Sequence, residues 1–203
     1  MRKAGKWIAL AAVLAVFVYM LSIAADKKQL SDEILRLHVV ANSDSTEDQT
    51  VKLQVRDAVL GEVEKLTAGA ACKEEAQRLL SGELEKLEQA ANAVLEANGF
   101  MDRAKVTLAK EAFPVREYDT FSLPAGVYDS LRVTIGEAQG RNWWCVVFPS
   151  LCIPAASEGV EDTAAGAGFS DSLSGAITGE PQYEVRFFLL DVWGRLENFF
   201  WKG

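Results

Sequence analysis

The N-terminal segment constrains the fold and location of this chain most strongly. Arg2, Lys3 and Lys6 precede residues 7–25, WIALAAVLAVFVYMLSIAA, which contain no charged side chain. A basic start followed by an apolar run is typical of an export signal, and Ser22-Ile23-Ala24 offers a small-x-small cleavage sequence. The run is also close to the roughly 20 residues that a membrane-spanning helix needs. A cleaved signal peptide and a retained N-terminal anchor therefore both stay open.

The basic flank places the N-terminus in the cytoplasm and the rest of the chain outside it. The whole chain has 21 Lys and Arg against 29 Asp and Glu, a net charge of −8. Without Arg2, Lys3 and Lys6, 18 basic residues face 29 acidic ones, so the exported part carries −11. This balance excludes a nucleic-acid binder, which needs a basic surface. It also gives the domain no electrostatic attraction to anionic lipid.

The periodicity of residues 26–154 predicts an α+β domain with a mainly antiparallel sheet packed with two amphipathic helices, preceded by the export helix. The expected helices span about 46–66 and 73–97, and the expected strands span 34–41, 104–112, 127–136 and 143–148. The strand at 127–136 is expected to be covered on one face. Residues 155–181 form an acidic loop rich in Gly, Ala and Ser, which we expect to be solvated.

Residues 182–203 are expected to pack on the domain as a short strand that runs into a helix. The alternation of Glu184-Val-Arg-Phe187 favours the strand. A helical face is formed by Val185, Phe188, Leu189, Val192, Leu196 and Phe199.

Strand 34–41 and the turn after it supply the first candidate site residues. Leu35, Leu37, Val39 and Ala41 form an apolar face that should meet the core, and Arg36 and His38 lie on the more polar face. Asn42-Ser43-Asp44-Ser45 predicts a tight turn. Ser45 and Asp48 predict a helix cap, and Asp48 and Lys52 an exposed i, i+4 pair.

No arrangement in the sequence predicts catalysis. His38 is the single histidine, which excludes a site with two imidazoles, and a mid-strand histidine is more often structural than a base. Asp44 with Asp48 or Asp57 could form a carboxylate pair, although turn and cap roles explain these residues more simply. The oxygens of residues 42–48 suit Ca²⁺ but lack the glycine and distal Glu of an EF-hand loop. We therefore expect no enzyme, cofactor, metal or small-molecule substrate.

The cysteines and tryptophans offer two further features. Cys145 and Cys152 could form a short-loop disulfide in an oxidising space, or remain two buried thiols. Cys72 is left over as an inert or intermolecular thiol. Trp143 and Trp144 lie on opposite faces of a strand, so one should enter the core. We take Trp144 as the candidate contact for a partner, with ordinary surface packing as the alternative.

Two blocks resemble the stage II sporulation protein R family. They are Ile34–Val59, ILRLHVVANSDSTEDQTVKLQVRDAV, and Phe121–Cys152, FSLPAGVYDSLRVTIGEAQGRNWWCVVFPSLC. They stand in the family's order behind an export signal, and the resemblance extends over about residues 34–154. Thr46 stands where the family tends to have a helix-starting Pro, a departure that affects only the helix cap.

The resemblance implies a sporulation signal. Similar proteins are made in the forespore and exported across its membrane into the space between the forespore and mother-cell membranes. There they activate a membrane-embedded aspartic protease that processes a mother-cell pro-sigma factor. The implied partners are this protease and the export machinery.

We place the candidate contact surface where strand 34–41 meets helix 46–66. Its residues, with Trp144, are Arg36, His38, Asn42, Asp44, Asp48, Lys52 and Arg56. Turn and cap roles alone are the alternative for residues 42–45. The rival functions are an exported cell-wall hydrolase that uses carboxylates and a non-catalytic envelope-binding module.

Overall fold

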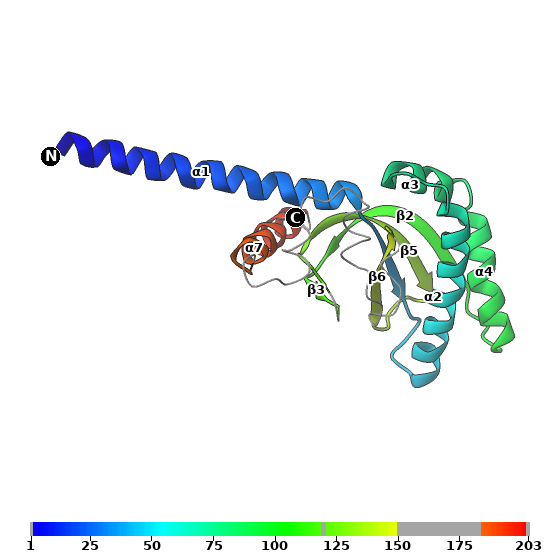
Figure 1. The fold of residues 1–203 in the computed structure, drawn as a ribbon. Coiled ribbons are helices and arrows are strands. Elements are labelled where there is room, and N and C mark those ends of the chain that lie inside the picture. Colours follow the sequence, from blue (N-terminus) through cyan, green and yellow to red (C-terminus); the bar gives the residue numbers. More distant parts are fainter. Residues whose placement is uncertain (1, 119–120, 150–183, 202–203) are drawn as a thin grey trace.

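The central sheet lies at the middle of the computed structural model, which describes residues 2–118, 121–149 and 184–201. Its strand order is β2-β5-β1-β6 (Figure 1). The bounds are β1 Leu35–Val40, β2 Ala104–Phe113, β5 Gly126–Ile135 and β6 Asn142–Phe148. β1 pairs in parallel with β5 and antiparallel with β6, and β2 pairs antiparallel with β5. The prediction of an α+β fold with a mainly antiparallel sheet is confirmed.

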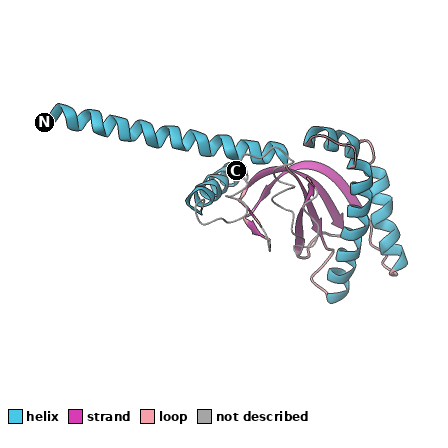
Figure 2. Cartoon of the chain, viewed as in Figure 1, coloured by secondary structure: helices cyan, strands magenta, loops and turns pink. Residues whose placement is uncertain are grey.

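Three helices cover one face of the sheet (Figure 2): α2 (Thr46–Thr67), α3 (Lys73–Ser81) and α4 (Leu84–Ala97). Leu35, Leu37 and Val39 of β1 pack in the core beneath them, as their alternation predicts. The single helix expected over 73–97 is wrong, because α3 ends at the cap residue Gly82 and α4 begins at Leu84. Glycine in a helix interior loses more conformational freedom than other residues, which favours a break at this position.

The opposite face of the sheet is also covered. Its buried cluster joins α1 (Arg2–Glu33), the hairpin of β3 (Arg116–Glu117) and β4 (Ser122–Leu123), and α7 (Glu184–Trp201) to the sheet. The members are Ile23, Leu30, Ile34, Phe113, Phe121, Leu123, Tyr128, Val146 and Leu190. The expected cover on one face of the strand at 127–136 is confirmed by the buried Leu131, Val133 and Ile135, and the start of β5 is covered on the other face as well, where Tyr128 and Ser130 are buried. β1 is buried along its whole length.

Helix α1 projects from the domain (Figure 1). Its segment Leu10–Glu33 is long and apolar enough to cross a membrane, as expected for a signal or an anchor. The helix continues past residue 25 without a break, and Ile23 and Leu30 are both 0% exposed in the second cluster. The C-terminal part of α1 is thus packed into the domain.

Helix α7 is helical from Glu184, so the strand expected at the start of this segment is wrong. Its packing also differs from the expected face. Leu190 is fully buried against the domain, whereas Phe188, Val192 and Leu196 point outward and are exposed. The loop expected at 155–181 lies outside the described residues.

Candidate functional site

The eight candidate residues fall into two groups on different sides of the sheet. Arg36, His38 and Trp144 lie on the face covered by the β3–β4 hairpin and Phe113. The other five, Asn42, Asp44, Asp48, Lys52 and Arg56, lie on the turn after β1 and on α2. The structure therefore does not bring all eight into one surface.

His38 is held by a packed polar cluster. Its ring stacks on Trp144 with centroids 3.8 Å apart, and only 6% of the residue is exposed. Its Nδ1 lies 3.3 Å from both Glu111 carboxylate oxygens, and its Nε2 lies 2.8 Å from Asn142 Oδ1. Both ring nitrogens are thus occupied by structural partners.

Glu111 completes this cluster from β2. Burial opposes ionisation of its carboxyl group, but the hydrogen bond with His38 and the charges of His38 and Arg132 outweigh burial and lower the pKa of Glu111. Arg132 Nη1 lies 3.2 Å from Glu111 Oε1. The cluster therefore keeps the Glu111 carboxylate charged and engaged.

Arg36 is fully buried, with a relative exposure of 0%. Its Nη2 donates a 3.0 Å hydrogen bond to Tyr118 Oη, and its guanidinium lies 4.0 Å from the centre of the Phe113 ring. Within the described residues its Nε and Nη1 have no hydrogen-bond partner. Burial lowers the pKa of Arg36. Neither Arg36 nor His38 presents its side chain to a partner in this arrangement.

The turn at 42–48 forms the helix cap that the sequence predicts. Ser45 Oγ accepts a 3.1 Å hydrogen bond from Asp48 N at the start of α2. The Asp48 carboxylate accepts from Asn42 Nδ2 at 3.3 Å and from Ser43 Oγ, and Asp48 is only 8% exposed. The carboxylate is thus enclosed by its own turn.

The expected exposed pair of Asp48 and Lys52 is wrong. Lys52 is 4% exposed, and its Nζ donates to Gln49 Oε1 at 2.7 Å and to the Arg141 carbonyl at 3.0 Å. Burial is the largest influence on the Lys52 ammonium and lowers its pKa. The reason for the error is the loop between β5 and β6, which covers this side of α2.

That loop, residues 136–141, is bound to the turn by several hydrogen bonds. Asn42 Oδ1 accepts from Glu137 N at 2.9 Å, and Asp44 Oδ1 accepts from Arg141 N at 2.6 Å. A Cβ atom at Gly140 would lie 2.1 Å from the carbonyl oxygen of Ser43, so the close approach requires glycine. This contact joins residues almost 100 positions apart, and no local pattern in the sequence predicts it.

The outer part of this region is a small mixed surface, here called the rim surface: the exposed residues Asp44, Arg141 and Trp143, together with Arg56, whose side chain is only 17% exposed. The Arg56 guanidinium lies 4.3 Å from the Trp143 ring centre, and Trp143 is 37% exposed. Asp44 and Arg141 form an exposed ion pair at 3.6 Å.

Trp143 and Arg141 were not among the candidate residues, although Trp143 was one of the two indoles on opposite faces of the strand. Trp144, the candidate of the two, packs against His38 and Phe113. Exposure therefore favours Trp143 over Trp144 as a contact residue.

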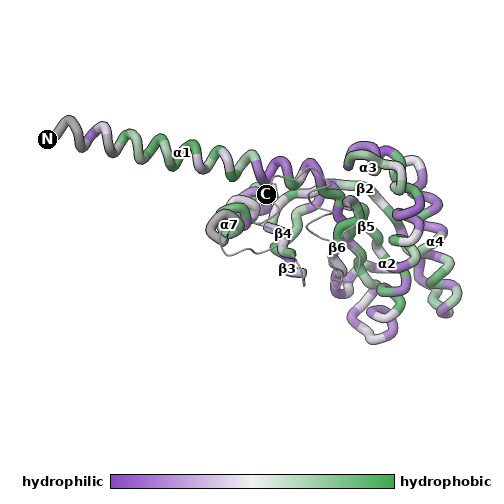
Figure 3. The backbone as a smooth tube through the Cα atoms, viewed as in Figure 1, coloured by the Kyte–Doolittle hydropathy of each residue, from purple (hydrophilic) through white to green (hydrophobic). Residues whose placement is uncertain are grey.

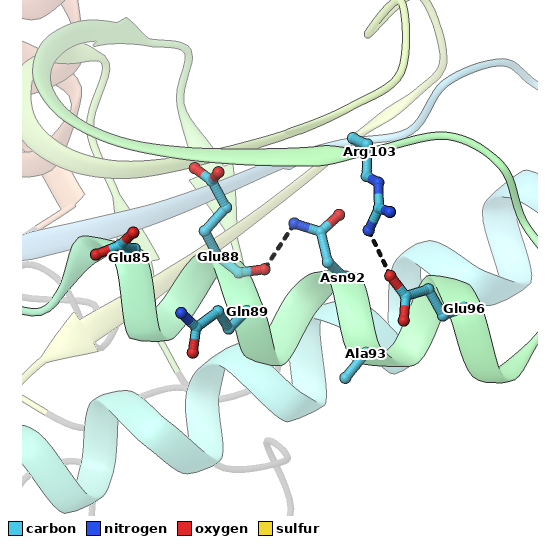
Figure 4. Close-up of a pocket in the computed structure, with 7 residues that line it drawn as sticks. All are labelled: Glu85, Glu88, Gln89, Asn92, Ala93, Glu96 and Arg103. Carbon is cyan, nitrogen blue, oxygen red and sulfur yellow. Dashed lines mark hydrogen bonds and ion pairs between the residues drawn. The ribbon is translucent and has the colours of Figure 1, made fainter.

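A shallow pocket lies between α4 and the start of β2 (Figure 4). Its polar residues serve the edge strand: Asn92 Oδ1 accepts from Ala104 N at 2.9 Å and Glu88 Oε2 accepts from Val106 N at 3.1 Å. Arg103 and Glu96 form an ion pair at its rim (Figure 4). The side chains of Asn92 and Glu88 therefore occupy backbone N–H groups of the edge strand β2 and hinder its pairing with another chain.

No group of three or more metal-ligating side chains occurs within the described residues. The carboxylates of Asp44 and Asp48 are both engaged in the turn. Cys72 is an exposed free thiol, and Cys145 is disulfide-bonded and buried. Because Cys152 lies outside the described residues, the Cys145–Cys152 pairing stays a prediction.

Comparisons with known proteins give one consistent result. The sequence pattern of the family "Stage II sporulation protein R" matches residues 31–158. The chain is 36% identical over 130 residues to Stage II sporulation protein R of Bacillus subtilis (strain 168). This match covers 64% of the chain and 58% of that relative. No solved structure matches the chain.

Proposed function

This chain belongs to the stage II sporulation protein R family, and we propose that it is an exported signal that activates a membrane-embedded aspartic protease, which then processes a mother-cell pro-sigma factor. The observation that carries this proposal is the family match over residues 31–158, which includes β1, the turn and the rim surface. In this proposal the forespore exports the protein into the space between the two membranes. Helix α1 directs the export and is then cleaved or kept as an anchor.

Activation of a protease by a protein ligand requires a specific surface. A ligand shifts an equilibrium between resting and active forms only if it binds the active form more tightly. The rim surface suits this role because it combines an exposed indole, a guanidinium stacked on it and an exposed ion pair. Trp and Arg are enriched among the residues that dominate binding energy at protein interfaces.

The first experiment tests the function itself. The full chain is co-expressed with the membrane protease and the pro-sigma factor in a non-sporulating host, and cleavage of the precursor is followed by immunoblot. We expect cleavage only when all three proteins are present. Equal cleavage with and without this chain would refute the proposal.

The second experiment tests the rim surface in the same host. Trp143→Ala and Arg56→Ala should each reduce precursor cleavage roughly thirty-fold, since truncating a residue that dominates an interface costs about 2 kcal/mol or more, and about 1.4 kcal/mol corresponds to ten-fold. Arg103→Ala is the control, because Arg103, like Arg56, is an ion-paired arginine, and it lies beside α4, away from the rim surface. If the rim variants accumulate and fold normally yet cleave the precursor as well as Arg103→Ala does, the rim surface is not the contact.

A further inference from the structure

Helix α7 exposes an apolar face that no described part of the chain covers. Its members are Phe188, Val192, Leu196, Phe199 and Phe200, with exposed fractions from 38% to 77%. Trp193 borders it and is 41% exposed. A continuous exposed patch of this kind marks a surface that contacts a protein or a membrane. We call it the outward face of α7.

The opposite side of α7 is fixed to the domain, so the orientation of the helix is set by specific contacts. Asp191 Oδ1 accepts from Ala125 N at 3.2 Å, and Asn198 Nδ2 donates to the Phe113 carbonyl at 2.7 Å. Gly194 lies directly against the Ala125 carbonyl, where a Cβ would be only 1.5 Å from the oxygen. The outward face therefore points away from the domain because polar and small residues occupy the packed side.

The position of α7 relates this face to the apolar helix α1. Lys27 on α1 forms an ion pair with Glu197 on α7. On a helix that rises about 1.5 Å per residue, Lys27 lies about 3 Å beyond Ala25, the end of the uncharged run. The C-terminal half of α7 is thus level with the point where a membrane-spanning α1 would leave the bilayer. Figure 3 shows the apolar stretch of α1 and α7 at the same end of the molecule.

The charges of α7 argue against a charged partner. Its charged side chains between residues 187 and 201 are Asp191, Arg195 and Glu197. Asp191 pairs with Arg195, and Glu197 pairs with Lys27. Phe, Trp and Leu side chains are those that an interfacial helix inserts among lipid headgroups. With a formal charge of −11 on the exported part, attraction to lipid must come from apolar burial.

We propose that the outward face of α7 lies in the headgroup region of the lipid bilayer beside α1, so that the exported domain is held against the membrane surface. The contact is apolar, so zwitterionic lipid is sufficient for it. It does not require that α1 be retained, because the packed side of α7 is fixed to β2 and the turn before β5 as well as to α1.

Tryptophan fluorescence of the full chain in phosphatidylcholine vesicles tests this proposal. All versions carry Trp7→Phe, which removes the tryptophan of α1. Lipid brominated near the headgroup end of its acyl chains should quench Trp193, and the quenching should persist at high salt. Leu196→Asp combined with Phe199→Asp should abolish most of it. Met101→Asp is the matched control, because Met101 is 94% exposed and lies in the loop before β2.

Each other outcome overturns the proposal. Absence of quenching in the parent shows that the face does not enter lipid. Equal quenching in the parent and the double variant shows that another part of the chain enters it, and loss of quenching at high salt shows an electrostatic contact. A parent that is dimeric in detergent and a double variant that is monomeric would assign the face to a second copy of the chain.

Discussion

At the scale of single residues, Asp129 on β5 connects three separate segments of the chain. Lys73 Nζ, at the start of α3, donates to Asp129 Oδ2 at 2.7 Å and to the Ser31 carbonyl of α1 at 2.9 Å. Lys110 of β2 lies 3.1 Å from the other carboxylate oxygen. Burial raises the pKa of Asp129, but the hydrogen bonds and charges of Lys73 and Lys110 outweigh burial, so its pKa is lowered.

This pairing predicts a pH-dependent contribution to stability. Because the pKa in the folded state lies below the unfolded value of about 3.9, the contribution is complete above that value and is lost as the pH falls through the folded pKa. Asp129→Asn leaves Lys73 buried without its carboxylate and should lower the free energy of unfolding by about 3 kcal/mol at neutral pH. Denaturant unfolding of the full chain at pH 7 and well below pH 4 measures this. An equal loss at both pH values would contradict the assignment.

Residue patterns in the sequence were informative where the interaction is local. The Ser45–Asp48 cap is such a case, since both partners lie within one helical turn. They failed for Lys52, because the Arg141 carbonyl that accepts its hydrogen bond comes from a loop 89 residues further along the chain. Burial of a long polar side chain depends on distant segments and leaves no trace in its neighbours.

At the scale of elements, α7 shows how an apolar stripe can mislead. The stripe expected to pack on the domain is largely exposed, and the packed side contains Leu190, Asp191, Gly194 and Asn198. A hydrophobic stripe indicates a face that avoids water, but it does not identify what covers it. The outward face of α7 is apolar because its partner lies outside the domain.

Gly194 provides a direct test of how α7 is docked. An added Cβ at this position would overlap the Ala125 carbonyl, so Gly194→Ala should displace α7 and lower the melting temperature. Gly61→Ala in α2 is the control, because nothing lies within 4 Å of its Cβ position. Removing backbone freedom from the unfolded chain should make that variant neutral or more stable, by up to about 1 kcal/mol. Equal melting temperatures for the two variants would show that α7 is not packed as described.

At the scale of the whole molecule, the sheet separates two hydrophobic clusters. One lies under α2, α3 and α4, and the other joins the end of α1 to the β3–β4 hairpin and α7. The apolar N-terminal helix is therefore also a structural helix, since Ile23 lies within the uncharged run and is 0% exposed. Cleavage after Ala24 would remove Ile23 from the second cluster.

This dual role predicts an effect of Ile23 on the stability of the full chain. Ile23→Ala should lower the free energy of unfolding by about 2–5 kcal/mol, as for other truncations of buried aliphatic side chains. Leu21→Ala, also in the uncharged run, is the matched control because Leu21 is 55% exposed. Unfolding of both variants in the same detergent provides the comparison. A loss for Leu21→Ala as large as that for Ile23→Ala would place α1 outside the folded core.

The sequence by itself determined the features that arise from neighbouring residues. These are the apolar N-terminal segment, the periodicity of the strands and of α2, the turn and cap at 42–48, and the family through its contiguous motifs. Hydrophobic periodicity and capping act over one or two turns of chain, so they can be read without the fold.

The tertiary structure decided which side chains are accessible. It placed Arg36 and His38 of β1 beneath a second layer and joined the 136–141 loop to the turn after β1. It also exposed Trp143 rather than Trp144 and turned the apolar face of α7 outward. Each of these outcomes depends on segments far apart in the chain coming together. The surface that a partner or a membrane meets is what such packing leaves uncovered, so it follows only from the complete fold.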